Sequence, residues 1–106
     1  MENKLTIHGK KKTLVFPYED ILYLQGEGRY TRIVTKNENK MVCKHLKLFE
    51  EKLECPPFFR VFKSFLVNTS KITKVIGRKV YVDHIKIPVS RDKLTELKNI
   101  LMQTTS

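Results

Sequence analysis

The feature that most constrains the fold is a series of short strand-like runs in the second half of the chain. Residues 58–68 are dense in aromatic and β-branched side chains, with one interruption at Lys63-Ser64. Three further runs follow, at residues 72–76, 79–82 and 85–89. The turn-forming pairs Gly77-Arg78 and Asp83-His84 separate these runs, as in antiparallel hairpins. This half of the chain is therefore predicted to be built from β-hairpins.

The start of the chain shows a similar pattern. Residues 4–7 and 13–16 flank a turn-forming segment that begins at His8. This arrangement predicts an N-terminal hairpin over about residues 3–16. Ile21–Leu24 is wholly apolar, which is typical of a strand buried on both faces.

A second hairpin is expected between residues 30 and 43. Gly26 and Gly28 predict a loop after the apolar strand. Apolar and polar residues then alternate through Tyr30–Thr35, as in a half-buried strand. Residues 40–43 are expected to return as its paired strand.

Two segments have helical periodicity instead. The first has apolar residues spaced by four, three and four, at Val42, Leu46, Phe49 and Leu53. Pro56-Pro57 is expected to end this helix. The second has apolar residues spaced by three and four, at Leu94, Leu97 and Leu101. Ser90 is suited to its N-cap, where a hydroxyl can accept a backbone N–H bond.

Together these segments predict one mainly β domain over residues 1–106, with several small antiparallel sheets and one or two short α-helices. The 41% hydrophobic content is enough for one modest core. No stretch approaches the roughly 18 apolar residues of a membrane span, and no signal-peptide run is visible. A cytoplasmic location is expected, with Cys43 and Cys55 as reduced thiols in the core.

The charge is strongly positive and unevenly distributed. The chain has 21 Lys and Arg against 11 Asp and Glu, a formal net charge of +10. Residues 60–106 hold 10 basic and only 3 acidic side chains. Such an excess attracts polyanions at long range, and nucleic acid is the commonest cytosolic polyanion. The charge therefore favours a nucleic-acid partner.

The sequence carries no recognisable catalytic or metal-binding constellation. Its histidines, His8, His45 and His84, have no partner ligand at metal-binding spacing. The acidic cluster Glu50-Glu51-Glu54 is interpreted as a solvated helix face. Gly26-Glu27-Gly28 lacks the third glycine of a phosphate-binding loop. We expect no enzyme activity, no cofactor, no metal and no small-molecule substrate.

From residue 20 onward the chain resembles the LytTR family, the DNA-binding output domain of many bacterial response regulators in two-component systems. Two blocks are specific together, the Phe-Arg…Ser…Val-Asn block and the Pro-Val-Ser-Arg block. The motifs occur in the order Ile21–Leu24, Tyr30, Phe49–Leu53, Phe59–Asn68, Ile72 and Ile87–Arg91. The N-terminal hairpin matches the family only in character.

The resemblance implies a fold of several small sheets and a mode of binding without a recognition helix. Loops between strands would enter successive major grooves of bent promoter DNA. The resemblance also implies direct-repeat sites, with a homodimer on DNA as one arrangement. Family members commonly carry a phosphoacceptor receiver domain, whereas residues 1–106 are expected to form the output domain alone.

Carried over residue by residue, the resemblance implies two sets of contacts. Base readout is assigned to Thr31, Lys63 and Arg91, and phosphate contact or positioning to Arg29, Tyr30, Ser64 and Lys93. Lysine and arginine can donate to guanine O6 and N7, and arginine can do so with two bonds. The sequence departs from the family at Phe62, where histidine is common, and at Thr31, which replaces a base-reading histidine of some members.

Alternatives remain open at this point. Tyr23, Tyr30 or Phe62 could stack on bases of single-stranded RNA or DNA. The strands of the N-terminal hairpin could instead serve a protein-interaction module. Lys63 could be a protective edge-strand lysine. Structural roles are expected for two polar residues outside the site, an ion pair for Arg60 and turn hydrogen bonds for Asn68.

Overall fold

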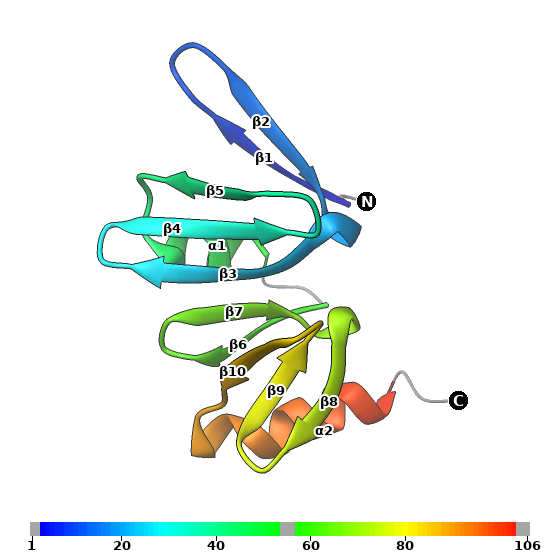
Figure 1. The fold of residues 1–106 in the computed structure, drawn as a ribbon. Helices are drawn as coiled ribbons and strands as arrows, with labels where there is room; N and C mark the ends of the chain where they lie inside the picture. The colour runs from blue at the N-terminus through cyan, green and yellow to red at the C-terminus, as the bar shows by residue number, and fades with distance from the viewer. Residues whose placement is uncertain (1–2, 54–56, 104–106) are drawn as a thin grey trace.

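The computed structural model describes residues 3–53 and 57–103. Figure 1 shows three antiparallel sheets and two α-helices in this part of the chain. The first half contains β1 (Lys4–His8), β2 (Thr13–Pro17), β3 (Ile21–Glu27), β4 (Tyr30–Thr35), β5 (Asn39–Val42) and α1 (Leu46–Lys52). The second half contains β6 (Phe58–Phe62), β7 (Phe65–Asn68), β8 (Ile72–Ile76), β9 (Lys79–Val82), β10 (Ile85–Pro88) and α2 (Leu94–Gln103). The mainly β fold with two short helices is confirmed.

Three 3-10 turns connect these elements: η1 (Tyr18–Asp20), η2 (Thr69–Lys71) and η3 (Arg91–Lys93). The largest sheet has five strands in the order β5-β4-β3-β7-β6. The hairpin β1-β2 and the three-stranded sheet β10-β9-β8 are separate sheets. The five-stranded sheet is therefore the centre of the domain, because it alone joins segments from both halves of the chain.

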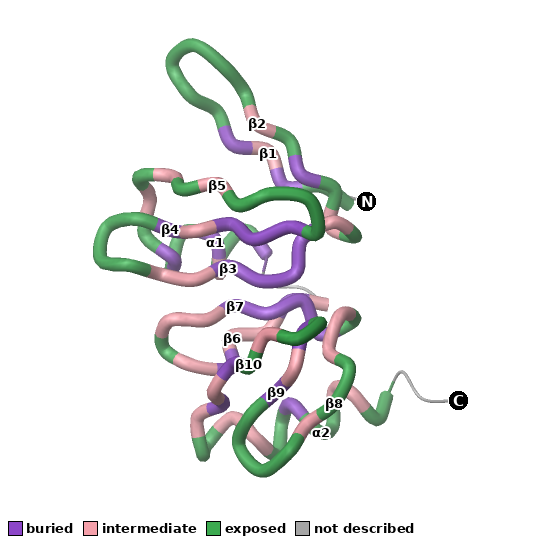
Figure 2. Tube along the Cα trace, viewed as in Figure 1, coloured by how far each residue is buried: buried purple, intermediate pink, exposed green. Residues whose placement is uncertain are grey.

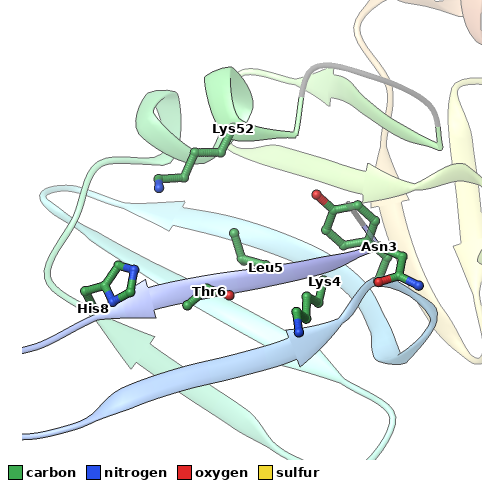
Figure 3. A pocket seen from close by; sticks show the side chains of 7 residues that line it. Asn3, Lys4, Leu5, Thr6, His8 and Lys52 are labelled. Carbon is green, nitrogen blue, oxygen red and sulfur yellow. The ribbon is translucent and has the colours of Figure 1, made fainter. Parts of the chain in front are cut away.

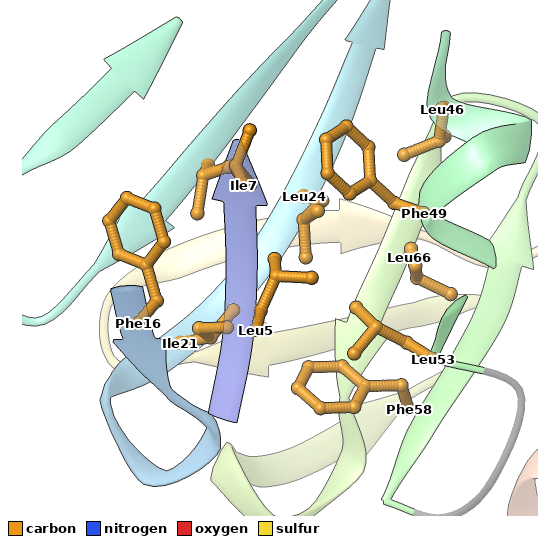
Figure 4. Packing of buried hydrophobic residues seen from close by; sticks show 11 residues of the cluster. Leu5, Ile7, Phe16, Ile21, Leu24, Leu46, Phe49, Leu53, Phe58 and Leu66 are labelled. Atoms are coloured by element: carbon orange, nitrogen blue, oxygen red, sulfur yellow. The ribbon is translucent and has the colours of Figure 1, made fainter. Parts of the chain in front are cut away.

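The central sheet is packed on both faces. One cluster of buried residues joins the sheet to the β1-β2 hairpin and α1, through residues such as Leu5, Leu24 and Phe49. Figure 4 shows these side chains converging between the elements. A second cluster includes Val67 on β7 and Leu97 on α2, and joins the opposite face to the three-stranded sheet and α2. Burial on both faces explains the apolar run at the start of β3 (Figure 2).

Several details differ from the sequence-based expectations. Val42 ends β5 and does not belong to α1, because β5 continues to pair with β4 at Thr31. Gly26 lies within β3, so the loop is shortened to Gly28-Arg29. Ser90 makes no side-chain cap bond, since η3 intervenes before α2. Cys43 is exposed and is not part of the core, because it follows the last residue of β5 on the surface. The expectations for Cys55 and for the end of the helix at Pro56 lie outside the described residues.

The domain measures 43 × 30 × 24 Å along its principal axes. In the part of the chain that the structure describes, no helix has the length and apolar character needed to cross a membrane.

Candidate nucleic-acid interface

Strand pairing brings two of the predicted contact loops together. β3 and β7 are antiparallel neighbours, with Gln25 opposite Phe65. The β3-β4 turn and the β6-β7 turn therefore lie at the same end of the central sheet. The backbone N–H of Gly26 donates to the carbonyl of Ser64 at 2.8 Å, which links the two turns directly.

The third predicted segment lies beside the same hairpin. The backbone N–H of Ser90 donates to the carbonyl of Val61 at 2.7 Å, which fixes the start of η3 against β6. The ammonium of Lys93 lies 5.8 Å from the ring centroid of Phe59, also on β6. In Figure 1 the β3-β4 turn, the β6-β7 turn and η3 all lie on the left-hand side of the domain.

The predicted side chains differ in exposure. Arg29, Lys63 and Arg91 are exposed, and Tyr30 is 45% exposed. Ser64 and Lys93 are half-buried. Across residues 3–53 and 57–103, ion pairs involve only the cations Arg32, Lys36 and Arg60. Arg29, Lys63 and Arg91 are thus not neutralised by a carboxylate of the described chain. We call the segments 28–30, 63–64 and 91–93 the three-turn surface.

Thr31 does not belong to this surface. Its side chain is fully buried, and its hydroxyl donates to the carbonyl of Lys44 at 2.7 Å. Successive residues of a strand point to opposite faces, so Tyr30 is exposed while Thr31 points inward. Base readout by Thr31 is therefore not supported, and its hydroxyl ties β4 to the segment that precedes α1.

Arg60 forms the expected ion pair. One of its nitrogens lies 2.5 Å from a carboxylate oxygen of Glu50 on α1. The guanidinium also donates to the carbonyl of Lys63, from Nε at 3.2 Å and from Nη2. Arg60 thereby holds the β6-β7 turn against α1. It is a positioning residue for Lys63, a role the sequence-based assignment did not include.

Asn68 has the expected structural role. Its side-chain amide donates to the carbonyls of Tyr18 and Ile21, and its oxygen accepts from the backbone and hydroxyl of Ser70. These bonds connect β7 with the start of β3. They set where β3 begins relative to β7, and so contribute to the alignment of the two turns at the other end.

The surface also includes residues that sequence reasoning missed. A shallow hollow of about 340 Å³ lies between the β3-β4 turn, the β6-β7 turn and the start of α1. His45 and Lys47 line it together with Lys63. No local signal in the sequence identifies them, because only the tertiary packing of α1 against β3 places them there. Gly28, at φ 64°, occupies the left-handed conformation that closes the β3-β4 turn.

The aromatic residues considered for base stacking are only partly available. Tyr23 is buried, and this burial raises the pKa of its hydroxyl, against a smaller opposing effect of Arg32. Phe62 is half-buried and packs against the second core cluster. Tyr30 alone of the three is well exposed. Of the three aromatic rings that the sequence suggested for stacking on single-stranded bases, only that of Tyr30 is thus well placed to do so.

The fold and its surface define a small β-sheet domain that presents unpaired cations from turns at one end. A comparison with protein families places it more specifically. The chain belongs to the LytTr DNA-binding domain family, whose family model matches residues 11–102. This is a family of DNA-binding domains of transcription regulators and not a family of enzymes.

Individual relatives agree with this assignment. The chain is 30% identical over 106 residues to the sensory transduction protein LytT of Bacillus subtilis, covering 94% of this chain and 44% of that protein. It is 28% identical over 105 residues to the heme-containing CO-sensing transcriptional regulator RcoM 2 of Paraburkholderia xenovorans, covering 92% and 39%. It is 29% identical over 98 residues to the transcriptional regulatory protein YpdB of Escherichia coli K12, covering 86% and 40%. The chain thus spans about two fifths of the length of these curated relatives.

A solved structure supports the fold assignment. A LytTr DNA-binding domain from Bacillus cereus aligns with a TM-score of 0.74 at 21% identity, covering 95% of this chain and 98% of that one. At 21% identity this similarity concerns the fold alone.

Proposed function

We propose that the domain binds duplex DNA sequence-specifically through the three-turn surface. The observation that carries the proposal is the convergence of the unpaired cations Arg29, Lys63 and Arg91 on turns that lie on one side of the domain. Loop cations on a rigid sheet can enter a groove without a recognition helix. The longest axis of the domain, 43 Å, exceeds the ~34 Å helical repeat of DNA, so the domain as a whole is long enough to lie across two successive grooves.

The chemistry of the side chains suggests different roles. Lys63 and Arg91 are exposed at turns and can donate to guanine O6 and N7, which are unique acceptors of the major groove. Arg29, Tyr30, Ser64 and Lys93 can donate to phosphate oxygens, which positions the domain on the duplex. Lys93 is partly held by the ring of Phe59, so its ammonium is presented in a limited range of positions.

The wider context follows from the relatives, which are named as transcriptional regulators and sensory transduction proteins. We infer that this domain acts as the DNA-binding output of a bacterial transcription regulator in the cytoplasm. Binding of two copies to direct repeats, with or without a homodimer contact, belongs to the same proposal.

Selection of bound duplexes from a random pool tests the proposal. The wild-type domain is expected to enrich a defined motif. Lys63→Ala and Arg91→Ala are each expected to lose about 1–3 kcal/mol on that motif and to relax preference at one base position. Competition binding of matched and mismatched duplexes measures both effects. Lys11→Ala, at the exposed tip between β1 and β2, removes the same charge away from the surface and serves as control.

Two outcomes would contradict the proposal. One is the enrichment of no motif by the wild-type domain. The other is an equal loss for Lys11→Ala, Lys63→Ala and Arg91→Ala, which would indicate that only the net charge matters. Stronger binding to single-stranded oligonucleotides than to the selected duplex would favour the alternative of base stacking on Tyr30.

A further inference from the structure

Among the described residues, β1 pairs only with β2, so its other edge has no neighbouring strand there. Tyr18 donates to the carbonyl of Asn3, and Gly9 donates to the carbonyl of Lys12. In an antiparallel ladder, hydrogen-bonded residue pairs alternate with pairs that are not hydrogen-bonded. The backbone N–H and C=O groups of the odd-numbered residues of β1 therefore face β2. The backbone N–H and C=O groups of Lys4, Thr6 and His8 therefore point away from β2. Pro17 lies opposite Lys4, and its lack of an N–H agrees with this alternation, because that pair needs no hydrogen bond.

This edge faces a cavity between the hairpin and α1. The cavity has a volume of about 610 Å³ and is lined by five residues of 3–8 together with Tyr18 and Lys52, and by no residue of β2. Figure 3 shows Lys52 of α1 extending from the helix toward β1. A second cavity of about 240 Å³ shares Thr6, His8 and Lys52 with the first. The two cavities form a groove along most of the ~15 Å length of β1.

The described residues that line this groove include cations and no carboxylate. Lys4 and Lys52 line the larger cavity, and Lys44 and Lys52 line the smaller one. None of the three forms an ion pair with another described residue. Leu48, which is exposed, adds an apolar surface on the α1 side, in front of the buried Phe49. The groove thus combines a row of backbone donors and acceptors with positive charge and an apolar surface.

We propose that this groove binds an extended acidic peptide segment of a partner protein, which adds a strand to β1. The alternating N–H and C=O groups of Lys4, Thr6 and His8 match the backbone of a peptide. The phosphates of a nucleic acid can only accept hydrogen bonds, so the outward carbonyls would repel them. Acidic side chains of the peptide would lie near Lys4, Lys44 and Lys52. This site is separate from the three-turn surface and does not depend on how that surface reads DNA.

The first experiment uses the whole 106-residue domain and a fluorescein-labelled heptapeptide of alternating Glu and Val. We expect saturable binding by fluorescence anisotropy. When the unlabelled peptide is titrated into the domain, the backbone amide NMR signals of Lys4, Thr6 and His8 should shift more than those of Leu5 and Ile7. A matched peptide of alternating Lys and Val should not bind. Equal shifts across both edges of the hairpin, or no saturation, would overturn the proposal.

Paired variants test the edge itself. Thr6→Pro removes an outward N–H from the β1 edge, and Val15→Pro removes one from the opposite edge, at the residue paired with Thr6. Thr6→Pro is expected to weaken peptide binding about tenfold, and Val15→Pro is expected to leave it unchanged. If both variants weaken binding equally, the strand-addition geometry is wrong.

A charge reversal gives a readout that does not depend on a proline. Lys52→Glu should weaken the peptide about three- to tenfold, whereas Lys11→Glu at the hairpin tip should have less effect. Neither variant should alter binding to the selected duplex beyond the effect of its charge. A single-stranded oligonucleotide that displaces the peptide with the same sensitivity to Lys52→Glu would show that the groove binds nucleic acid, and would overturn the proposal.

Discussion

Thr31 and its neighbours show how sharply function can change between adjacent residues of a strand. Arg29 and Tyr30 are exposed at the β3-β4 turn, whereas Thr31 is fully buried. The Thr31 hydroxyl satisfies the carbonyl of Lys44, which precedes α1. The bond is partly buried, so a carbonyl that loses this donor carries part of the desolvation cost of an unpaired buried group. The contribution of Thr31 is therefore to stability and to the placement of α1.

This role gives a prediction at the residue scale. Thr31→Val should lower the free energy of unfolding by about 1–2 kcal/mol, because the Lys44 carbonyl loses its donor while the apolar volume is preserved. Thr73→Val removes the longer bond from an exposed hydroxyl to the carbonyl of Tyr81, and should cost less than about 0.5 kcal/mol. Urea denaturation measures both. Equal losses for the two variants would contradict the structural role of Thr31.

Sequence reasoning succeeded at residues whose chemistry is decided locally. The ion pair of Arg60 and the turn hydrogen bonds of Asn68 were both expected. It failed at Thr31, because a one-residue change of register exchanges the buried and exposed faces of a strand. It also missed the bond from Arg60 to the carbonyl of Lys63, since the register shift between Arg60 and Phe62 cannot be read from composition.

At the scale of elements, the alignment of the two turns depends on close packing between β3 and α1. Gly26 donates its N–H to the Ser64 carbonyl across the turns. A Cβ at this position would lie 3.1 Å from the Cβ of Leu46, the first residue of α1. Such a distance requires α1 or β3 to move. Gly26 thus keeps α1 close to the three-turn surface, where His45 and Lys47 line the hollow.

A glycine substitution tests this alignment. Gly26→Ala should cost about 1–3 kcal/mol of stability through overpacking against Leu46, and should also weaken DNA binding several-fold. Gly77→Ala is the control, because its φ of 58° makes alanine unfavourable by about 1 kcal/mol in the β8-β9 turn. Both variants should be less stable, but only Gly26→Ala should lose DNA affinity. If both keep full affinity, the packing of α1 does not position the surface.

Element prediction from the sequence was accurate at the turns marked by Gly77-Arg78 and Asp83-His84. The three strands of the second half and the break at Lys63-Ser64 are confirmed. The error at Val42 has a physical cause. Its spacing from Leu46 fits a helix, but hydrogen bonding to β4 keeps the segment extended. Strand pairing is a tertiary interaction, and periodicity within one segment does not report it.

At the scale of the whole molecule, the central sheet joins two cores and presents turns at one end. The excess charge of residues 60–106 was visible in the sequence. The sequence alone could not show that Lys63 and Arg91 share a side with Arg29, because this depends on the order of strands in the central sheet and on the Ser90–Val61 bond that holds η3 against β6. The convergence of these cations therefore required the structure.

The charge gives a prediction for the molecule as a whole. If Arg29 and Lys93, the two cations assigned to phosphate contact, each displace about one counterion, log K should fall against log salt with a slope of about −2. Arg29→Ala should make the slope less negative by about one, while leaving the preferred motif unchanged. Equilibrium binding between about 50 and 200 mM salt measures this slope. A slope near zero would contradict the electrostatic contribution.

NMR shift mapping on the selected duplex shows which part of the domain meets the DNA. The largest backbone amide shifts are expected at residues 28–30, 63–64 and 91–93, with smaller ones at His45 and Lys47. The hairpin tip at residues 10–12 and the β8-β9 turn should shift little. Largest shifts at the hairpin tip or the β8-β9 turn, with residues 28–30, 63–64 and 91–93 unaffected, would contradict the proposed interface.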